Sequence, residues 1–461
     1  MPPSCARNTS TSLEAFSRSP GGMLTKTRGA VLLTMCAGMF LVQLDVTVVN
    51  VALPTIGARL HTGLATQQWI VDGYAVVLAS LLLSGGAIGD VLGHRRIVLA
   101  GFTVFGLASA GCALAPSGAV LVGFRVVQGF GAALLLPGTL AVITAVYPER
   151  REQARALGIW AGVSALALAG GPLLGGLLIT ASGWRLLFWI NVPLVAVAVL
   201  ACLRIVPAGT RTSRRIDFAG AATAAISLAA LVFAVIQGAL PAVAVALAAA
   251  VAFVWVERRG ADPMLPPELV RSRQFAGANL VAGAMNFVGL GTILVLTLYF
   301  QEVLGYSPLH GALLLLPGFV PLSLMAPVTG RLVGKYGPRP LMLAGLVLGV
   351  LALLNLLRAG PGTGYLTVLP TWFCLGLGMG LLTAAVVAAA VDGVPADRGG
   401  VASGVNNTAR QACGAIGVAA FGVITGEPAD HAAFVSGLHT VGLLGAALWM
   451  VAIAITAGTV R

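Results

Sequence analysis

The chain has 461 residues, of which 58% are hydrophobic and only 9% are charged, and its formal net charge is +12. A soluble domain has roughly 25% charged residues, so this composition excludes a soluble globular protein and predicts an all-α polytopic membrane protein. The basic residues lie in short clusters between apolar runs and not on one face with interleaved aromatic residues. This pattern argues against a nucleic-acid partner and for a lipid bilayer.

Apolar segments follow one another along the chain, each close to the roughly 20 residues that a helix needs to cross a bilayer. We therefore predict fourteen transmembrane helices. They lie near residues 29–52, 66–88, 96–115, 119–140, 154–180, 185–206, 217–237, 239–256, 274–300, 309–332, 340–358, 366–390, 401–425 and 435–458. The segment before them is rich in Ser, Pro and Arg and is predicted to be a disordered cytoplasmic tail. Met23 opens a more usual beginning for such a protein, MLTKTRGAVLL, so Met1 and Met23 are alternative start sites.

Lysine and arginine residues support this arrangement, because basic loops stay on the cytoplasmic side of a membrane. If both termini are cytoplasmic, 23 of the 27 basic residues fall in the inner regions. Only Arg59, Arg185 and Arg358 fall in outer loops, and Arg125 lies within a span. Arginine far outnumbers lysine, which is typical of a GC-rich bacterial genome. We therefore predict a bacterial cytoplasmic (inner) membrane protein with both termini in the cytoplasm.

Two six-helix bundles separated by two extra helices are the predicted organisation. The seventh and eighth spans are nearly devoid of polar side chains, which indicates a lipid-facing pair inserted between two halves. The loops at 86–96 and 330–340 share their glycine spacing and a late arginine, as expected of transporters built from repeats. The predicted units are a tail at 1–28, a first bundle at 29–206, the extra pair at 207–258, a cytoplasmic loop at 259–273 and a second bundle at 274–461.

Three charged residues lie well inside the predicted spans: Asp45, Asp72 and Arg125. An ionised carboxylate near the bilayer centre costs at least roughly 2.5–3.5 kcal/mol, so an acid there usually faces a cavity or a partner. Measured from the span ends at about 1.5 Å per residue, all three lie at a similar depth. Burial disfavours an ionised carboxyl group and a nearby arginine favours it, so we predict that they couple protonation to transport. A fixed structural ion pair is the alternative, and the sequence leaves open which aspartate pairs with Arg125.

Other residues within the spans are candidates for a substrate cavity. Asn50 lies about 140° around the first helix from Asp45, and Asn279 and Asn286 align at i, i+7 on the ninth span. Hydrogen bonding between helices is the alternative role for these asparagines. The predicted cavity residues are Asn50, Gln128, Asn279, Met285, Asn286 and Tyr299.

Two segments are predicted to control conformation. The fifth span contains GGPLLGG, whose glycines favour close helix packing and whose proline, Pro172, favours a bend. We expect a hinge or seal there, with ordinary small-residue packing as the alternative. In the cytoplasmic loop after the second span, anchoring at the membrane surface is enough to explain Arg95 and Arg96. It does not explain Asp90. The predicted gating residues are Gly86, Asp90, Gly93, Arg95, Arg96, Gly171, Pro172, Gly175 and Gly176.

Several sequence motifs lie in or beside these predicted spans. They are LDVTVVNVALP at 44–54, WIVDGY at 69–74, GAIGDVLGHRR at 86–96, RVVQGFGAA at 125–133, GVSALALAGGPLLGG at 162–176, WRLLFWINVP at 184–193, LYFQEVLGYSP at 298–308 and GVASGVNNTARQ at 400–411. Together they resemble the major facilitator superfamily, and closely its fourteen-helix drug/proton antiporter branch, from Met23 to the C-terminus. The chain departs from the pattern at Val91, where a basic residue is usual.

This resemblance implies a secondary active transporter that works by alternating access. It would export small lipophilic or cationic drugs or antibiotics across the cytoplasmic membrane in exchange for protons. The resemblance also implies that Asp90 locks the outward-facing state.

Other classes of protein fit the sequence less well. An ATP-driven pump is disfavoured because the chain has no GxxxxGK[ST] motif. The histidines and cysteines are scattered singly, so we predict no enzyme, no metal site and no other cofactor. Export of a self-made metabolite or facilitated transport without protons are the alternatives, and a membrane receptor or sensor is less favoured. The predicted partners are a small-molecule substrate, protons and the bilayer, with a monomer as the functional unit.

Overall fold

The computed structural model describes residues 21–207, 217–260, 269, 271–360, 362–394 and 399–460, and the regular elements in these ranges are helices. The expected all-helical membrane architecture is therefore confirmed. Residues 1–20 of the expected tail lie outside the described part, and the first helix begins at Gly21, before the predicted start at 29.

The described helices form three groups in chain order. The first group is α2 (Gly21–Leu60), α3 (Leu64–Leu92), α4 (His94–Leu114), α5 (Gly118–Val146), α6 (Arg150–Ser182), α7 (Arg185–Trp189) and α8 (Asn191–Ile205). The second is α9 (Phe218–Gln237) and α10 (Leu240–Arg259). The third is α12 (Arg273–Leu298) with a π-helical turn at Tyr299–Val303, α13 (Pro308–Tyr336), α14 (Pro338–Asn355) with a 3-10 turn at Leu356–Arg358, α15 (Tyr365–Asp392), α16 (Gly399–Thr425) and α17 (His431–Thr459).

Eleven of the described helices are long and apolar enough to cross a membrane, and counting the bent α6 as one span raises the number to twelve. These lengths and compositions match a multi-pass membrane protein. The count of fourteen spans stays a prediction.

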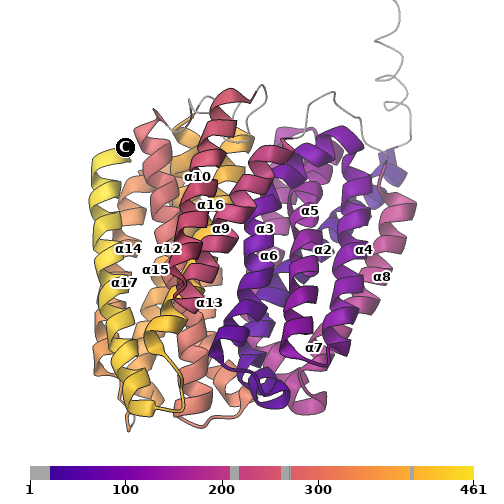
Figure 1. The fold of residues 1–461 in the computed structure, drawn as a ribbon. Helices are drawn as coiled ribbons and strands as arrows, with labels where there is room; N and C mark the ends of the chain where they lie inside the picture. Colours follow the sequence, from indigo (N-terminus) through magenta and orange to yellow (C-terminus); the bar gives the residue numbers. More distant parts are fainter. Residues whose placement is uncertain are drawn as a thin grey trace, which may run out of the picture.

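The first and third groups form two bundles that lie side by side (Figure 1). Within the first bundle α5 packs on α3 and α4, and α2 packs on α6; within the second, α12 packs on α16, and α15 packs on α13 and α14. The bundles meet mainly where α6 contacts α13 and where α3 contacts α16. We call this boundary the seam.

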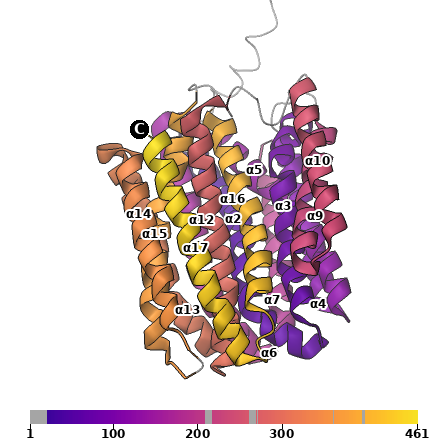
Figure 2. The ribbon, with the colours of Figure 1, turned by 60° about the vertical axis from the view of Figure 1, so that its left-hand side comes forward.

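The α9–α10 pair lies against the α3–α16 side of the seam (Figure 2). Val232 and Ile236 of α9 share a small apolar cluster with Val76 of α3 and with α16. Helix α10 packs on α9 and is otherwise largely exposed, as a lipid-facing helix would be. The origin of the pair as an insertion between two halves stays a prediction.

The predicted internal repeat has a backbone counterpart. Gly93 ends α3 and begins α4 with φ 94°, and Gly337 ends α13 and begins α14 with φ 77°. Two residues after each glycine, an arginine donates to a carbonyl near the end of its bundle's last helix. Arg95 bonds Leu203 O at 2.5 Å, and Arg339 bonds Ala457 O at 2.9 Å. The equivalent loops therefore make equivalent tertiary contacts.

We expect the substitution Gly337→Ala to destabilise the protein by about 1–3 kcal/mol, because φ 77° with ψ 170° is a region that only glycine adopts without strain. Gly334→Ala is the matched control, since a Cβ at this helical glycine meets nothing within 4 Å. Thermal unfolding of the purified protein in detergent measures both. Equal melting temperatures for the two variants would contradict the expectation.

Candidate functional site

A buried ion pair joins Asp45 of α2 to Arg125 of α5. The two residues are only 4% and 1% exposed. Arg125 Nη1 donates to Asp45 Oδ2 and also to Gln128 Oε1, at 2.7 Å for the latter, and Nε donates to Ile70 O at 2.9 Å. The structure thus brings Asp45, and not Asp72, to the arginine.

Further hydrogen bonds surround this pair. Gln128 Nε2 donates to Asp45 Oδ1 at 3.0 Å, so both carboxylate oxygens have a partner. Gln128 also reaches Ser109 Oγ at 3.4 Å, and Asn191 Nδ2 donates to the same hydroxyl at 2.9 Å. The Tyr74 ring lies 4.4 Å from the guanidinium carbon, a distance that allows a cation–π interaction. We call these residues the polar network.

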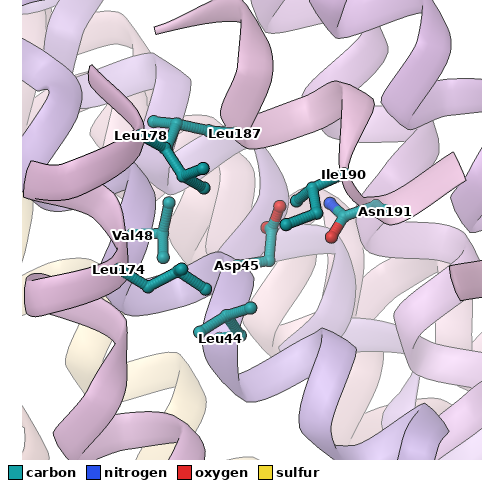
Figure 3. Close-up of a pocket in the computed structure, with 8 residues that line it drawn as sticks. All are labelled: Leu44, Asp45, Val48, Leu174, Leu178, Leu187, Ile190 and Asn191. Carbon is teal, nitrogen blue, oxygen red and sulfur yellow. The ribbon is translucent and has the colours of Figure 1, made fainter. Parts of the chain in front are cut away.

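A small pocket opens beside the polar network (Figure 3). It is lined by Leu44, Asp45, Val48, Leu174, Leu178, Leu187, Ile190 and Asn191. Six of these eight side chains are apolar, and the polar ones are Asp45 and Asn191. In this conformation the pocket gives the Asp45 carboxylate an apolar neighbourhood.

Asp72 of α3 has a different environment. It is 0% exposed, and neither carboxylate oxygen has a hydrogen-bond partner within the described part of the chain. The structure therefore divides the three predicted charged residues into one ion pair and one buried acid without a partner among the described residues. Buried polar groups are normally hydrogen-bonded, so this acid is an exception that calls for a functional reason.

The predicted cavity residues do not gather at one place. Gln128 belongs to the polar network, and Met285 and Tyr299 are both 0% exposed in the packed core. Asn50 is also buried, and its Nδ2 donates to Val46 O at 2.6 Å while Oδ1 has no partner in the described residues.

Asn279 and Asn286 bond across to α16, which is the alternative role expected for them. Asn406 Nδ2 donates to Asn279 Oδ1 at 3.2 Å, and Arg410 Nε donates to Asn286 Oδ1 at 3.3 Å. Sequence reasoning missed Arg410 because it was counted with the cations of the inner loops. It lies eleven residues into α16, within the span predicted at 401–425, and that position was the signal that could have found it.

The glycines of α6 allow two close helix contacts. A Cβ added at Gly171 would overlap the Thr47 side chain of α2, and one at Gly176 would lie 2.7 Å from Leu309 Cα of α13. Pro172 and Gly175 are buried between them. The helix bends by 43° between Arg155–Leu168 and Gly170–Ser182. The GGPLLGG segment therefore packs within its own bundle and also across the seam.

The predicted gating loop after α3 is described only in part. Gly86 and Asp90 lie on α3, but the side chain of Asp90 and the surroundings of Gly86 are not part of what the structure describes. Arg95 joins α4 to α8 within one bundle, and Arg96 is exposed. The roles predicted for these residues stay predictions.

Three described hydrogen bonds cross the seam, all at one end of the bundles. Gln68 Nε2 donates to Ala419 O at 3.1 Å, and Gln301 Nε2 donates to Val51 O at 3.0 Å. The amide of Leu64 donates to Glu427 Oε1 at 3.3 Å. This end of the bundles holds the α2–α3 and α12–α13 turns. It lies opposite the C-terminal end of α17 (Figure 1). The bundles are therefore fastened together at that end.

A family model described as the Major Facilitator Superfamily matches residues 35–418. The methylenomycin A resistance protein of Streptomyces coelicolor is 35% identical, over 92% of this chain and 91% of the relative. The multidrug resistance protein Stp of Mycobacterium tuberculosis is 35% identical, over 87% and 76%. The cephamycin export protein CmcT of Amycolatopsis lactamdurans is 35% identical, over 96% and 95%.

Solved structures of other transporters have a similar fold. A peptide transporter POT in complex with sulfate superposes with a TM-score of 0.72 at 17% identity, covering 94% of this chain and 95% of that one. A bacterial homologue of the human lysosomal transporter Spinster, in an inward-facing and unoccupied conformation, gives 0.67 at 18% identity, covering 93% and 96%. At these identities the similarity supports the fold alone.

We expect Asp45→Asn to lower the stability of the protein strongly, because Arg125 then stays buried without its counter-charge. Breaking one partner of a buried ion pair costs about 3–5 kcal/mol. The double variant Asp45→Asn/Arg125→Gln removes both charges and should recover part of the loss. Thermal unfolding in detergent measures the cycle, and fully additive losses in the double variant would show that the two residues do not stabilise each other.

We expect Gly176→Ala to open the fastened end of the seam, because the added Cβ meets the α13 backbone, which cannot move aside like a side chain. Gly170→Ala is the control, since a Cβ there meets nothing within 4 Å. Spin labels at the exposed positions Thr180 and Leu313 report the distance between α6 and α13. The distance should increase only in Gly176→Ala, and an unchanged distribution would argue against a seal at this glycine.

Proposed function

This chain belongs to the major facilitator superfamily, and from this membership we propose that it is a proton-coupled exporter of drugs or antibiotics. It is a transporter and not an enzyme. Relatives named for antibiotic or multidrug resistance, or for antibiotic export, align with more than four fifths of the chain. The proposed cargo is accordingly a small, largely apolar molecule, which leaves the cytoplasm by alternating access.

The proposed proton coupling rests on Asp72, which is buried without a hydrogen-bond partner among the described residues. An ionised carboxylate without a partner is costly to bury. Exchange of a proton lets the same side chain be buried in one conformation and open to water in another. Because α3 packs against α16 across the seam, a change at Asp72 acts where the two bundles move relative to each other.

Asp45 has a different part in this proposal. Arg125 and Gln128 occupy both of its carboxylate oxygens, and the arginine lies beside it as a counter-charge. We assign Asp45 and Arg125 to holding α2 and α5 in register beside the pocket. Since Asp45 is engaged, it supplies no free negative charge for a cationic cargo.

The proposed transport cycle follows from the position of the seam contacts. We place both chain termini on the cytoplasmic side, as the distribution of basic residues favours. The fastened end with Gln68, Gln301 and Gly176 is then the outer end, so this conformation is closed to the outside. Export requires these contacts to break while contacts form at the inner end, with the glycine-rich α6 sliding on α13.

We expect Asp72→Asn to abolish transport driven by a pH gradient, with at least about a tenfold loss of initial rate, because the amide cannot exchange a proton. Counterflow without a gradient should persist. Asp392→Asn, at an exposed acid at the end of α15, is the matched control. Proteoliposomes with an internal pH-sensitive dye measure proton exchange when puromycin, ethidium or a carboxylate-bearing β-lactam is added.

An Asp72→Asn protein that exchanges protons for cargo at the wild-type rate would remove Asp72 from the coupling. A wild-type protein that moves these compounds at the same rate with and without a gradient would replace antiport by facilitated transport.

A further inference from the structure

Arg410 is a cation in the middle of α16, within the transmembrane span predicted at 401–425. It lies eleven residues after the first residue of the 27-residue α16, or about 16 Å along the helix axis. Its side chain is half-buried. An arginine at this depth is costly unless it meets a partner or a water-filled cavity.

The described residues offer Arg410 little compensation. Its one hydrogen bond runs from Nε to Asn286 Oδ1 at 3.3 Å, and it forms no ion pair in the described part of the structure. A guanidinium has five N–H donors, so most of its donors are unused. Arg125, the other arginine at mid-membrane depth, uses its donors on three groups and has a carboxylate partner.

No described acid of the second bundle can serve as a permanent counter-charge. From residue 274 to the C-terminus, the described acids all lie at or beyond helix ends: Glu302, Asp392, Glu427 and Asp430. In the first bundle, Asp45 is taken by Arg125. Asp72 makes no ion pair with Arg410 among the described residues. The positive charge therefore has no fixed counter-charge among the described residues.

Neighbouring polar atoms on the same turn of α16 are also unused. Asn406 Nδ2 bonds Asn279, but its Oδ1 has no partner, and Thr408 Oγ1 has none either among the described residues. Helix α12 approaches α16 closely beside this turn, because the small residues Gly283 and Gly414 lie at their contact. Arg410 is thus held on a rigid helix pair, with Asn286 fixing one edge of its guanidinium.

We propose that Arg410, positioned by Asn286, binds a carboxylate or a similar oxyanion group of the exported molecule. The proposal rests on the proposed export function and adds a substrate class to it: cargo that is largely apolar with one anionic group. The planar guanidinium matches the two oxygens of a carboxylate, and the surrounding apolar helices strengthen the attraction by excluding water. Such cargo supplies the counter-charge that the protein itself lacks.

Binding of matched acids and amides to the purified full-length protein in nanodiscs tests this site. The probes are 1-pyrenebutyrate, 2-naphthoate and benzoate, each paired with its uncharged primary amide. At pH 7.5 and without any gradient, at least one acid should bind wild type about 10- to 100-fold more tightly than its amide, the range expected for charge-assisted hydrogen bonds. Arg410→Gln should remove this preference and leave amide binding unchanged.

Two variants serve as comparisons in this experiment. Arg204→Gln, at an exposed arginine at the end of α8, should keep the preference, and Arg410→Lys should keep part of it because the charge remains. If Arg410→Gln does not elute as a folded protein, the comparison of acid and amide binding between Arg410→Lys and wild type tests the proposal. Benzoate, but not benzamide, must then displace 1-pyrenebutyrate from wild type, and Arg410→Lys must weaken acid binding alone.

The proposal is overturned if no acid binds wild type more tightly than its amide, or if the preference survives Arg410→Gln. It is also overturned if Arg410→Gln weakens acids and amides equally, which would make Arg410 structural. Because the assay needs no transport, the two proposals fail separately. A protein that exports drugs without acid preference refutes the anion site alone, and one that prefers acids but moves nothing refutes export alone.

Discussion

The pairing of Arg125 with Asp45 is the interaction on which the first bundle depends. The pair lies among apolar helices, where water is not available to solvate either charge, so its hydrogen bonds have to come from the protein. They come from α2, α4, α5 and α8 and from the backbone of α3, through Gln128, Ser109 and Asn191. One buried cation thereby connects most helices of that bundle. Asp45 and Asn191 of the same network also line the pocket, so these hydrogen bonds hold part of its wall in place.

The second bundle holds its mid-helix cation, Arg410, differently, and the proposed chemistry rests on this asymmetry. Arg125 has a carboxylate partner and three hydrogen bonds, whereas Arg410 has one hydrogen bond, to a neutral partner, among the described residues. The isolated acid, Asp72, is on α3, and the isolated cation is on α16, which are the helices that pack together at the seam. Under the two proposals above, a proton on α3 and an anion on α16 would act on two helices that meet at the same boundary.

Hydropathy predicted the helical architecture, and the glycine spacing of two loops predicted the internal repeat, because both depend only on local sequence. Gly93 and Gly337 could be matched from spacing alone, and the structure gives them the same backbone role. The partner of Arg125 could not be predicted, since residues at equal depth differ in rotation about their helix axes. For the same reason Met285 and Tyr299 turned out to be core residues. Arg410 was missed because counting basic residues by loop ignored how far it lies inside a helix.

The α9–α10 pair makes the two faces of the seam unequal. Helix α9 lies over the α3–α16 side, whereas on the other side α6 and α13 touch each other directly through Gly176. In the proposed orientation Gly176 lies at the outer end, so a compound dissolved in the inner leaflet would meet α9 on one face and the inner part of the α6–α13 boundary on the other. Cargo that partitions into lipid before capture would be loaded sideways, past α6 and α13, and the lipid around that boundary would act as a reservoir that concentrates it.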